Sequence, residues 1–143
     1  MFPRKRTSRE NNSENGNAVV EFIGVLIVLF VPLMIAVVDM AVVLDARAAA
    51  TSAARDAGRV YVRAASDAQG RDSARLTAHL VLSDRGIGSG PVTFTCRTRP
   101  CLSPGNRVMV TVEAHAPLPY LGRTVAVTGH VIYTVDLYRE VRP

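Results

Sequence analysis

The 143-residue chain has no tryptophan, only three histidines and only two cysteines. It also lacks a Gly-x-Ser-x-Gly elbow, a His-Glu-x-x-His zinc motif and a glycine-rich phosphate loop. His79, His115 and His130 are too far apart along the chain to match any metal-ligand spacing. We therefore expect no enzymatic activity, no metal, no cofactor and no small-molecule substrate.

Aromatic residues are also scarce, although positive charge is in excess with a formal net charge of +5. Such an excess raises the hypothesis of nucleic-acid binding. However, the basic residues are scattered and do not alternate with aromatic side chains, as they do in single-strand binders. A basic membrane protein is the simpler interpretation, and DNA binding stays open as an alternative.

The two cysteines, Cys96 and Cys101, have four residues between them. No second pair exists, so the spacing does not favour a structural zinc site. In an extracytoplasmic domain the two would form a small-loop disulfide, whereas in the cytosol they would be free thiols.

What the chain does have is one long apolar run, because residues 22–38 are seventeen consecutive residues without a charge. A helix rises about 1.5 Å per residue and a bilayer core is about 30 Å thick, so this run with its flanks predicts one transmembrane helix over residues 17–44. Pro32 inside it removes one hydrogen bond, which membrane helices tolerate. Asp39 at its outer end is either an interfacial residue or a paired intramembrane charge.

Residues 1–16 form a polar leader with four basic residues, which indicates a cytoplasmic N-terminus. Four arginines also follow the run within about twenty residues, so the positive-inside rule alone gives a tie. The shortness of the leader and the cysteine pair break this tie. They favour a single-pass protein in the inner membrane with its C-terminal domain outside the cytoplasm.

Glu21 is the only charge between Asn17 and Val38. A carboxylate deep in the bilayer costs roughly 2.5–3.5 kcal/mol, so Glu21 either reaches the interface or pairs with a cation. The pattern Gly16-x-x-x-x-Glu21-Phe22 resembles the prepilin-peptidase site of type IV pilin-like proteins. This resemblance implies cleavage after Gly16, a new amino group on Asn17 that pairs with Glu21 of a neighbouring subunit, and Phe22 as part of the motif.

Residues 45–65 are rich in alanine and are expected to continue the helix outwards. Small residues follow a heptad spacing that allows close packing, either on a partner helix or on the chain's own sheet, and both remain open. The members of this seam are Ala46, Ala50, Ala53, Ala57, Val60 and Ala64.

Residues 66–143 predict a small extracytoplasmic α+β head. Ser66 or Asp67 caps a second helix, which a glycine-rich segment ends. From residue 92 the period changes to two, and three strands with turns between them predict an antiparallel meander with one apolar face over the helices. The side chains expected on apolar faces are Leu76, Leu80 and Val81 of the helix and Val92, Phe94, Cys96, Val108, Val110, Val112, Val125, Val127, Val131, Tyr133, Val135 and Leu137 of the strands.

The first half of the chain is similar to the TadE-like family of Flp (tight-adherence) pilus assembly. That family usually has Ala-Val-Glu-Phe before the apolar run, which corresponds to residues 19–22. It also has an acidic residue near the end of the run, then an arginine and Ala-Ala-Arg-Glu-Gly-Ala-Arg, which correspond to Asp39, Arg47 and residues 53–59. Pro32 lies further from the glutamate than is usual, and Ala57-Gly58 is reversed, which leaves the TadE and TadF branches open.

The resemblance implies a pilin-like α+β fold: a long N-terminal transmembrane helix that continues into an extracytoplasmic helix, then a small antiparallel three-stranded sheet. It implies a membrane-anchored minor pilin or pseudopilin that helps assemble a Flp/Tad-type pilus and is incorporated in the fibre or remains in the membrane. The implied partners are the major Flp pilin, a TadF-like sister subunit, the Tad inner-membrane platform, a prepilin peptidase and the lipid bilayer.

Two other functions remain as alternatives. In the first, the chain is a secreted binding module whose signal peptide is cut near residues 48–50. The apolar run is longer than the usual core of about 7–15 residues, and Asp39 and Asp45 lie between it and the cut. In the second, the chain is a competence-type pseudopilin, whose affinity for duplex DNA would fall with salt.

Overall fold

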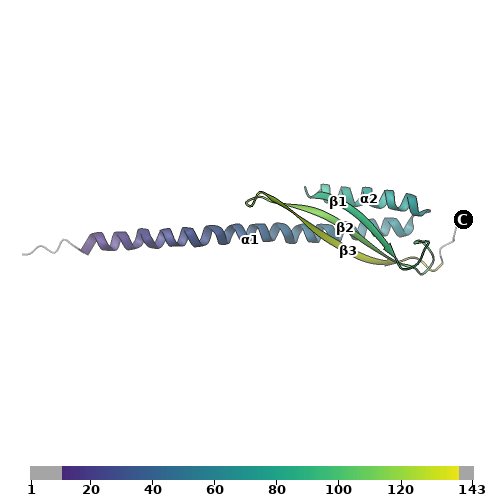
Figure 1. Ribbon diagram of the computed structural model, residues 1–143, viewed down its shortest axis with the longest axis horizontal. Coiled ribbons are helices and arrows are strands. Elements are labelled where there is room, and N and C mark those ends of the chain that lie inside the picture. Colours follow the sequence, from purple (N-terminus) through teal and green to yellow (C-terminus); the bar gives the residue numbers. More distant parts are fainter. Residues whose placement is uncertain (1–10, 139–143) are drawn as a thin grey trace, which may run out of the picture. The chain divides into compact units, whose positions relative to one another are not determined.

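The computed structural model describes residues 11–138, with side chains from residue 17 onward. Two helices precede an antiparallel three-stranded sheet, which confirms the predicted α+β fold (Figure 1). The chain divides into two compact units, one that ends at Val38 and one that begins at Asp39. The elements are α1 (Asn11–Arg63), α2 (Asp67–Ser83), β1 (Gly88–Cys96), β2 (Arg107–Leu118) and β3 (Arg123–Thr134).

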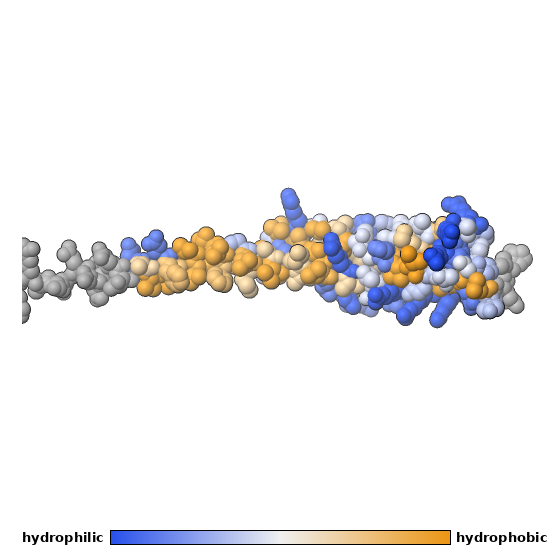
Figure 2. Space-filling model, turned by 90° about the horizontal axis from the view of Figure 1, so that it is seen from below, coloured by the Kyte–Doolittle hydropathy of each residue, from blue (hydrophilic) through white to orange (hydrophobic). Residues whose placement is uncertain are grey.

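Helix α1 is continuous over 53 residues and passes through Pro32. Most large apolar side chains between Val19 and Leu44 are exposed, because no other segment of the described chain packs on them. Figure 2 shows apolar residues over the visible face of this stretch. Within the described residues, one helix is long and apolar enough to cross a membrane, namely the stretch Asn17–Arg63 of α1.

The alanine-rich part of α1 packs on the chain's own sheet. A Cβ atom at Gly129 of β3 would overlap backbone atoms of Ala50 and Thr51, so helix and strand are in backbone contact there. The ring of Tyr133 covers Gly58 in the same way, and its hydroxyl donates to the carbonyl oxygen of Arg55 at 3.0 Å. The seam is therefore used within the chain, which decides between the two alternatives for its central residues. The fully buried alanines are Ala46, Ala49, Ala50, Ala53, Ala54 and Ala57.

The sheet is a meander in the order β1-β2-β3 with antiparallel neighbours, as predicted. The central strand β2 alternates strictly, and its buried side chains face α1 and α2. The edge strand β1 begins at Gly88, earlier than predicted. It accommodates Pro91 through a register shift between Ser89 and Val92, which is where an edge strand tolerates proline. Val108, Val110, Val112, Ala114 and Ala116 form the buried row of β2.

Helix α2 begins as predicted, because the Ser66 side chain accepts a hydrogen bond from the backbone N–H of Gln69 at 3.3 Å. The prediction of its buried face is wrong, since Leu76 and Leu80 are exposed and Val81 is only half-buried. Three small residues let the helix approach its neighbours closely, and with one leucine they form the buried face instead: Gly70, Ala74, Ala78 and Leu82.

Two residues expected on the apolar face of β3 are also exposed. Leu137 lies three residues beyond the end of the strand at Thr134 and is exposed, whereas Val135, directly after the strand, is still buried. Val125 lies near the start of the strand and is more than one-third exposed. The strand is buried mainly in its middle, around Val127 and Gly129.

Candidate functional site

The predicted processing site lies inside α1. The helix begins at Asn11, so Gly16 and Asn17 belong to its first two turns, and Asn17 is exposed. Residues 1–10 of the predicted leader lie outside the described residues. Cleavage after Gly16 stays a prediction.

Glu21 stands at one end of a shallow depression on α1 whose other lining residues are Gly24, Val25, Val28 and Leu29. These positions share one face of the helix because they follow the spacing i, i+3, i+4, i+7 and i+8. At Gly24 no neighbouring atom lies within 4 Å of the place where a Cβ would be, so the surface is notched there. An exposed carboxylate beside a notch in an apolar surface suits a second helix that brings a cation.

The described chain does not itself supply that cation. Among the side chains that the structure describes, none forms an ion pair with Glu21. Phe22, the other predicted assembly residue, is exposed but does not line the depression. The structure therefore brings Glu21 together with Gly24, a residue that no sequence motif marked.

Asp39 follows the uncharged run directly and is only 5% exposed. Neither carboxylate oxygen has a hydrogen-bond partner among the described residues. The sequence left Asp39 as either an interfacial or a paired charge. No partner charge contacts it within the described residues, and its place at the interface stays a prediction. Its burial depends on segments that are distant in sequence, which the apolar pattern could not reveal.

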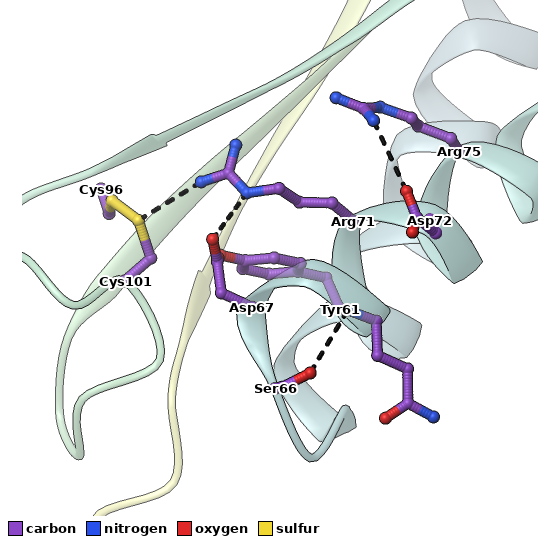
Figure 3. Close-up of polar contacts among 9 residues, drawn as sticks. Tyr61, Ser66, Asp67, Arg71, Asp72, Arg75, Cys96 and Cys101 are labelled. Carbon is purple, nitrogen blue, oxygen red and sulfur yellow. Dashed lines mark hydrogen bonds and ion pairs between the residues drawn. A yellow bond between two sulfur atoms is a disulfide. The ribbon is translucent and has the colours of Figure 1, made fainter. Parts of the chain in front are cut away.

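A second polar group joins the C-terminal end of α1, the start of α2 and strand β1 (Figure 3). The Tyr61 hydroxyl donates to Asp67, and Arg71 Nε donates to the other Asp67 oxygen at 2.8 Å. The Arg71 guanidinium lies 5.4 Å from the ring centre of Phe94, which itself packs 4.6 Å from the Tyr61 ring. We call Tyr61, Asp67, Arg71 and Phe94 the joint cluster.

Burial, hydrogen bonds and neighbouring charges shift the pKa values of Tyr61 and Asp67 in the joint cluster. Burial of the ring, reinforced by the hydrogen bond to Asp67, raises the pKa of Tyr61 well above its usual value. Burial also acts to raise the pKa of Asp67, but the hydrogen bonds from Tyr61 and Arg71 outweigh it and hold that pKa below its usual value. The ionised carboxylate of Asp67 links α1 to α2 through these two hydrogen bonds. No sequence motif predicts the cluster, because its members are separate in sequence.

Cys96 and Cys101 form a disulfide in the structure. The loop that the disulfide closes is held by Asn106, whose buried side chain donates to the carbonyl oxygens of Thr98 at 2.7 Å and Cys101 at 3.0 Å. Arg71 Nη2 lies 3.8 Å from the sulfur of Cys101, so the disulfide adjoins the joint cluster (Figure 3).

Within the described residues, no group of three or more histidine, cysteine, aspartate or glutamate side chains is placed to hold a metal ion. His115 lies 3.4 Å from Glu113 on the surface of β2.

Comparison with known proteins gives a family match over the first helix. Residues 16–59 match the family model described as TadE-like protein, which confirms the resemblance seen in the motifs. The match links the chain to proteins associated with the Tad pilus, a family not known for enzymatic activity. It covers less than a third of the 143 residues and ends before α2 and the sheet. No curated protein and no solved structure matches the chain.

Proposed function

We propose that this chain, with its TadE-like match over residues 16–59, is a membrane-anchored minor pilin or pseudopilin that takes part in assembling a Flp/Tad-type pilus. One observation carries the proposal. The first unit exposes a continuous apolar helix surface with a single notched face beside Glu21. Such a surface is stable only in lipid or against other apolar helices.

In the proposed function, each segment of the chain has its own role. Residues 1–16 are a leader removed after Gly16, and residues 17–44 cross the inner membrane. Residues 45–65 continue the helix outside the cytoplasm, and residues 66–143 form the head. The disulfide between Cys96 and Cys101 supports a head on the oxidising side, because disulfides persist there and are rare in the cytosol.

In this account Glu21 provides registry between subunits. The amino group of Asn17, once freed by cleavage, pairs with Glu21 of a neighbouring subunit, and the notch at Gly24 lets the two helices approach closely. An ion pair shielded from water near the interface is stronger than a surface pair, although desolvation offsets part of that gain. The partners are those that the family resemblance implies: the major pilin, a TadF-like sister subunit, the inner-membrane platform and the prepilin peptidase.

The substitution Glu21→Gln tests this function, because it keeps the size of the side chain and removes its charge. In a strain that lacks the chain, the variant should insert and be processed to a product that begins at Asn17. Recovery of partner pilin subunits by co-purification and the number of pili per cell should both fall.

Asp45→Asn is the matched control, since Asp45 is an exposed carboxylate on the same helix and lies 3.6 Å from Arg85 in a surface ion pair. Surface pairs of this kind contribute about 0–1 kcal/mol, so this variant should assemble pili normally. If Glu21→Gln also leaves partner recovery and pilus number at wild-type values, Glu21 is only an interfacial residue and the proposed registry is wrong.

A further inference from the structure

We propose that the tip of the β2–β3 hairpin, residues 119–123, rests in the outer interfacial layer of the lipid bilayer that α1 crosses. The chain would then contact the membrane twice, through its helix and through this hairpin tip. The inference depends on the membrane anchoring proposed above. It adds a lipid-binding surface in the head, outside the part of the chain that matches the TadE-like family model.

The chemistry of the hairpin tip suits a lipid interface. Tyr120 and Leu121 are adjacent, large and apolar, and they are 62% and 60% exposed. Leu118 is buried, and its carbonyl oxygen accepts a hydrogen bond of 3.1 Å from Gly122, so the turn is closed. Gly122 has the positive φ of 59° that this turn requires. The two exposed side chains therefore project from a closed turn and have no partner in the described head to cover them.

Charge around the hairpin tip has the sign that a bacterial membrane attracts. Arg123 follows the turn and is exposed, and neither the tip nor β3 contains an acidic residue. The carboxylates of α1 nearest this level are Asp39, which is buried, and Asp45, which is paired with Arg85. Tyrosine is enriched at membrane interfaces, and arginine can reach lipid phosphates while its stem lies along apolar surface. Anionic lipids attract such a side chain by about 1 kcal/mol.

The contacts between α1 and β3 give the level of the hairpin tip along the helix. Ala50 faces Gly129 and Gly58 faces Tyr133, so helix and strand run in the same direction. Eleven residues back from Ala50 along the helix, at about 1.5 Å each, lead to Asp39. Five residues back from Gly129 along the strand, at about 3.3 Å each, cover the same distance and lead to Thr124. Figure 1 shows the hairpin lying along the part of α1 that belongs to the same unit.

The burial of Asp39 independently supports the placement of the base of the hairpin beside Asp39. An aspartate on a lone helix would be open to solvent, whereas Asp39 is only 5% exposed and so must be covered by another segment. The base of the hairpin is the segment that the register of α1 and β3 places there. The hairpin tip therefore lies about one helical turn from Asp39, on the side of Asp39 that faces the bilayer.

The edge of the bilayer lies at the same level. The uncharged run ends at Val38, and Asp39 is the next residue. Met40 and Leu44 are still large, apolar and exposed, and Asp45 begins the polar part of the helix surface. The boundary between hydrocarbon and headgroups thus falls at residues 39–44. Because the hairpin tip continues past Thr124 toward the bilayer, Tyr120 and Leu121 lie at the inner edge of the headgroup layer.

The absence of tryptophan from the chain provides a clean test, because each inserted tryptophan is the only one. The full chain carrying Leu121→Trp would be reconstituted in vesicles of phosphatidylethanolamine and phosphatidylglycerol that contain phosphatidylcholine brominated on its acyl chains. Ile132→Trp is the matched control, since Ile132 lies on the same hairpin and is 61% exposed. Its neighbour Tyr133 packs on Gly58, about 28 Å beyond Asp39 along the helix. Phe30→Trp reports on the anchor itself.

We expect the bromolipids to quench Phe30→Trp strongly. Leu121→Trp should be quenched several-fold more than Ile132→Trp, most efficiently by bromines near the glycerol end, and its emission should shift to the blue. All three original side chains are exposed, so none of the changes removes buried packing. Tyr120→Trp repeats the measurement at the adjacent position.

The outcomes separate this inference from the function on which it depends. If Phe30→Trp is quenched while Leu121→Trp behaves like Ile132→Trp, the lipid contact of the hairpin tip is wrong and the anchor stands. If Leu121→Trp shifts to the blue without bromolipid quenching, a protein and not lipid covers the tip, which also overturns the inference. If Phe30→Trp is unquenched, the proposed anchoring fails.

Discussion

Tyr61 is the residue in which burial, hydrogen bonding and charge are most closely coupled. Its ring is buried against Phe94, and its hydroxyl is satisfied by Asp67 at the start of α2. Since Arg71 binds the other oxygen of the same carboxylate, loss of the phenol leaves Asp67 with one of its two side-chain partners. The hydroxyl therefore stabilises the junction between the two helices.

Tyr61→Phe should lower the free energy of unfolding by about 1 kcal/mol, which is less than for a fully buried charged bond because Asp67 is partly exposed. The depressed pKa of Asp67 means that this contribution is present above about pH 4 and is lost as the carboxylate is protonated at lower pH. The raised pKa of Tyr61 means that it is also lost above about pH 10, where the unfolded tyrosine ionises first.

Denaturant unfolding of the wild type and Tyr61→Phe across pH measures this difference, in which the other titrating groups cancel. The expected curve is a plateau at neutral pH that declines at both ends. Tyr120→Phe is the control, because it removes an exposed hydroxyl with no hydrogen bond in the structure, and it should change nothing. A difference between wild type and Tyr61→Phe that is independent of pH would contradict the roles assigned to the two groups.

At the scale of elements, the head depends on how closely α1 approaches β3. Gly129 is buried, and its missing side chain allows the backbones to touch at Ala50 and Thr51. A methyl group there has no flexible neighbour to displace, because the atoms that it meets belong to the helix backbone. Helix and strand would have to separate.

Gly129→Ala should therefore cost about 3 kcal/mol or more, at the upper end of the range for overpacked cores. Thr128→Ala changes the adjacent, exposed residue of the same strand and should stay within about 0.5 kcal/mol of wild type. Thermal unfolding of both variants decides the matter. Equal stability of the two would mean that α1 and β3 do not pack as closely as described.

The elements differ in how far the sequence could predict them. Alternation of valines predicted the three strands, and Ser66 predicted the start of α2, because these signals are local. The apolar face of α2 was mispredicted since hydrophobicity pointed to Leu76 and Leu80, whereas close packing selected small residues. Gly129 carried no local signal, because its role depends on a helix that is distant in sequence.

The candidate site shows the same limit. The motif predicted Gly16, Glu21 and Phe22 as site residues. A motif does not show which other side chains lie beside them on the surface of the helix. The notch at Gly24 follows from which side chains share one helix face. The burial of Asp39 and the formation of the joint cluster require the tertiary fold, and no spacing along the chain predicts them.

At the scale of the whole molecule, the disulfide reports on topology. If the head lies outside the cytoplasm, Cys96 and Cys101 should resist a maleimide in intact, non-reduced cells and react fully after reduction. Closing so short a loop contributes about 2 kcal/mol in the chain-entropy model, so the reduced head should also unfold more easily. Tyr138→Cys, at a highly exposed position, shows that the reagent reaches the head. Quantitative labelling of both native cysteines without reductant would refute the disulfide and would also argue against a head on the oxidising side.

The central claim is that the Glu21 face of α1 contacts another pilus subunit, and photocross-linking in living, piliated cells tests it most directly. A benzophenone amino acid at Val28 lies on that face, whereas the same group at Phe30 lies about 160° around the helix and serves as the control. The account predicts an adduct between position 28 and the N-terminal helix of a pilin subunit, identified by mass spectrometry, weaker at position 30 and lost with Glu21→Gln. Equal adducts at both positions, or none with any pilus subunit in cells that make pili, would contradict it.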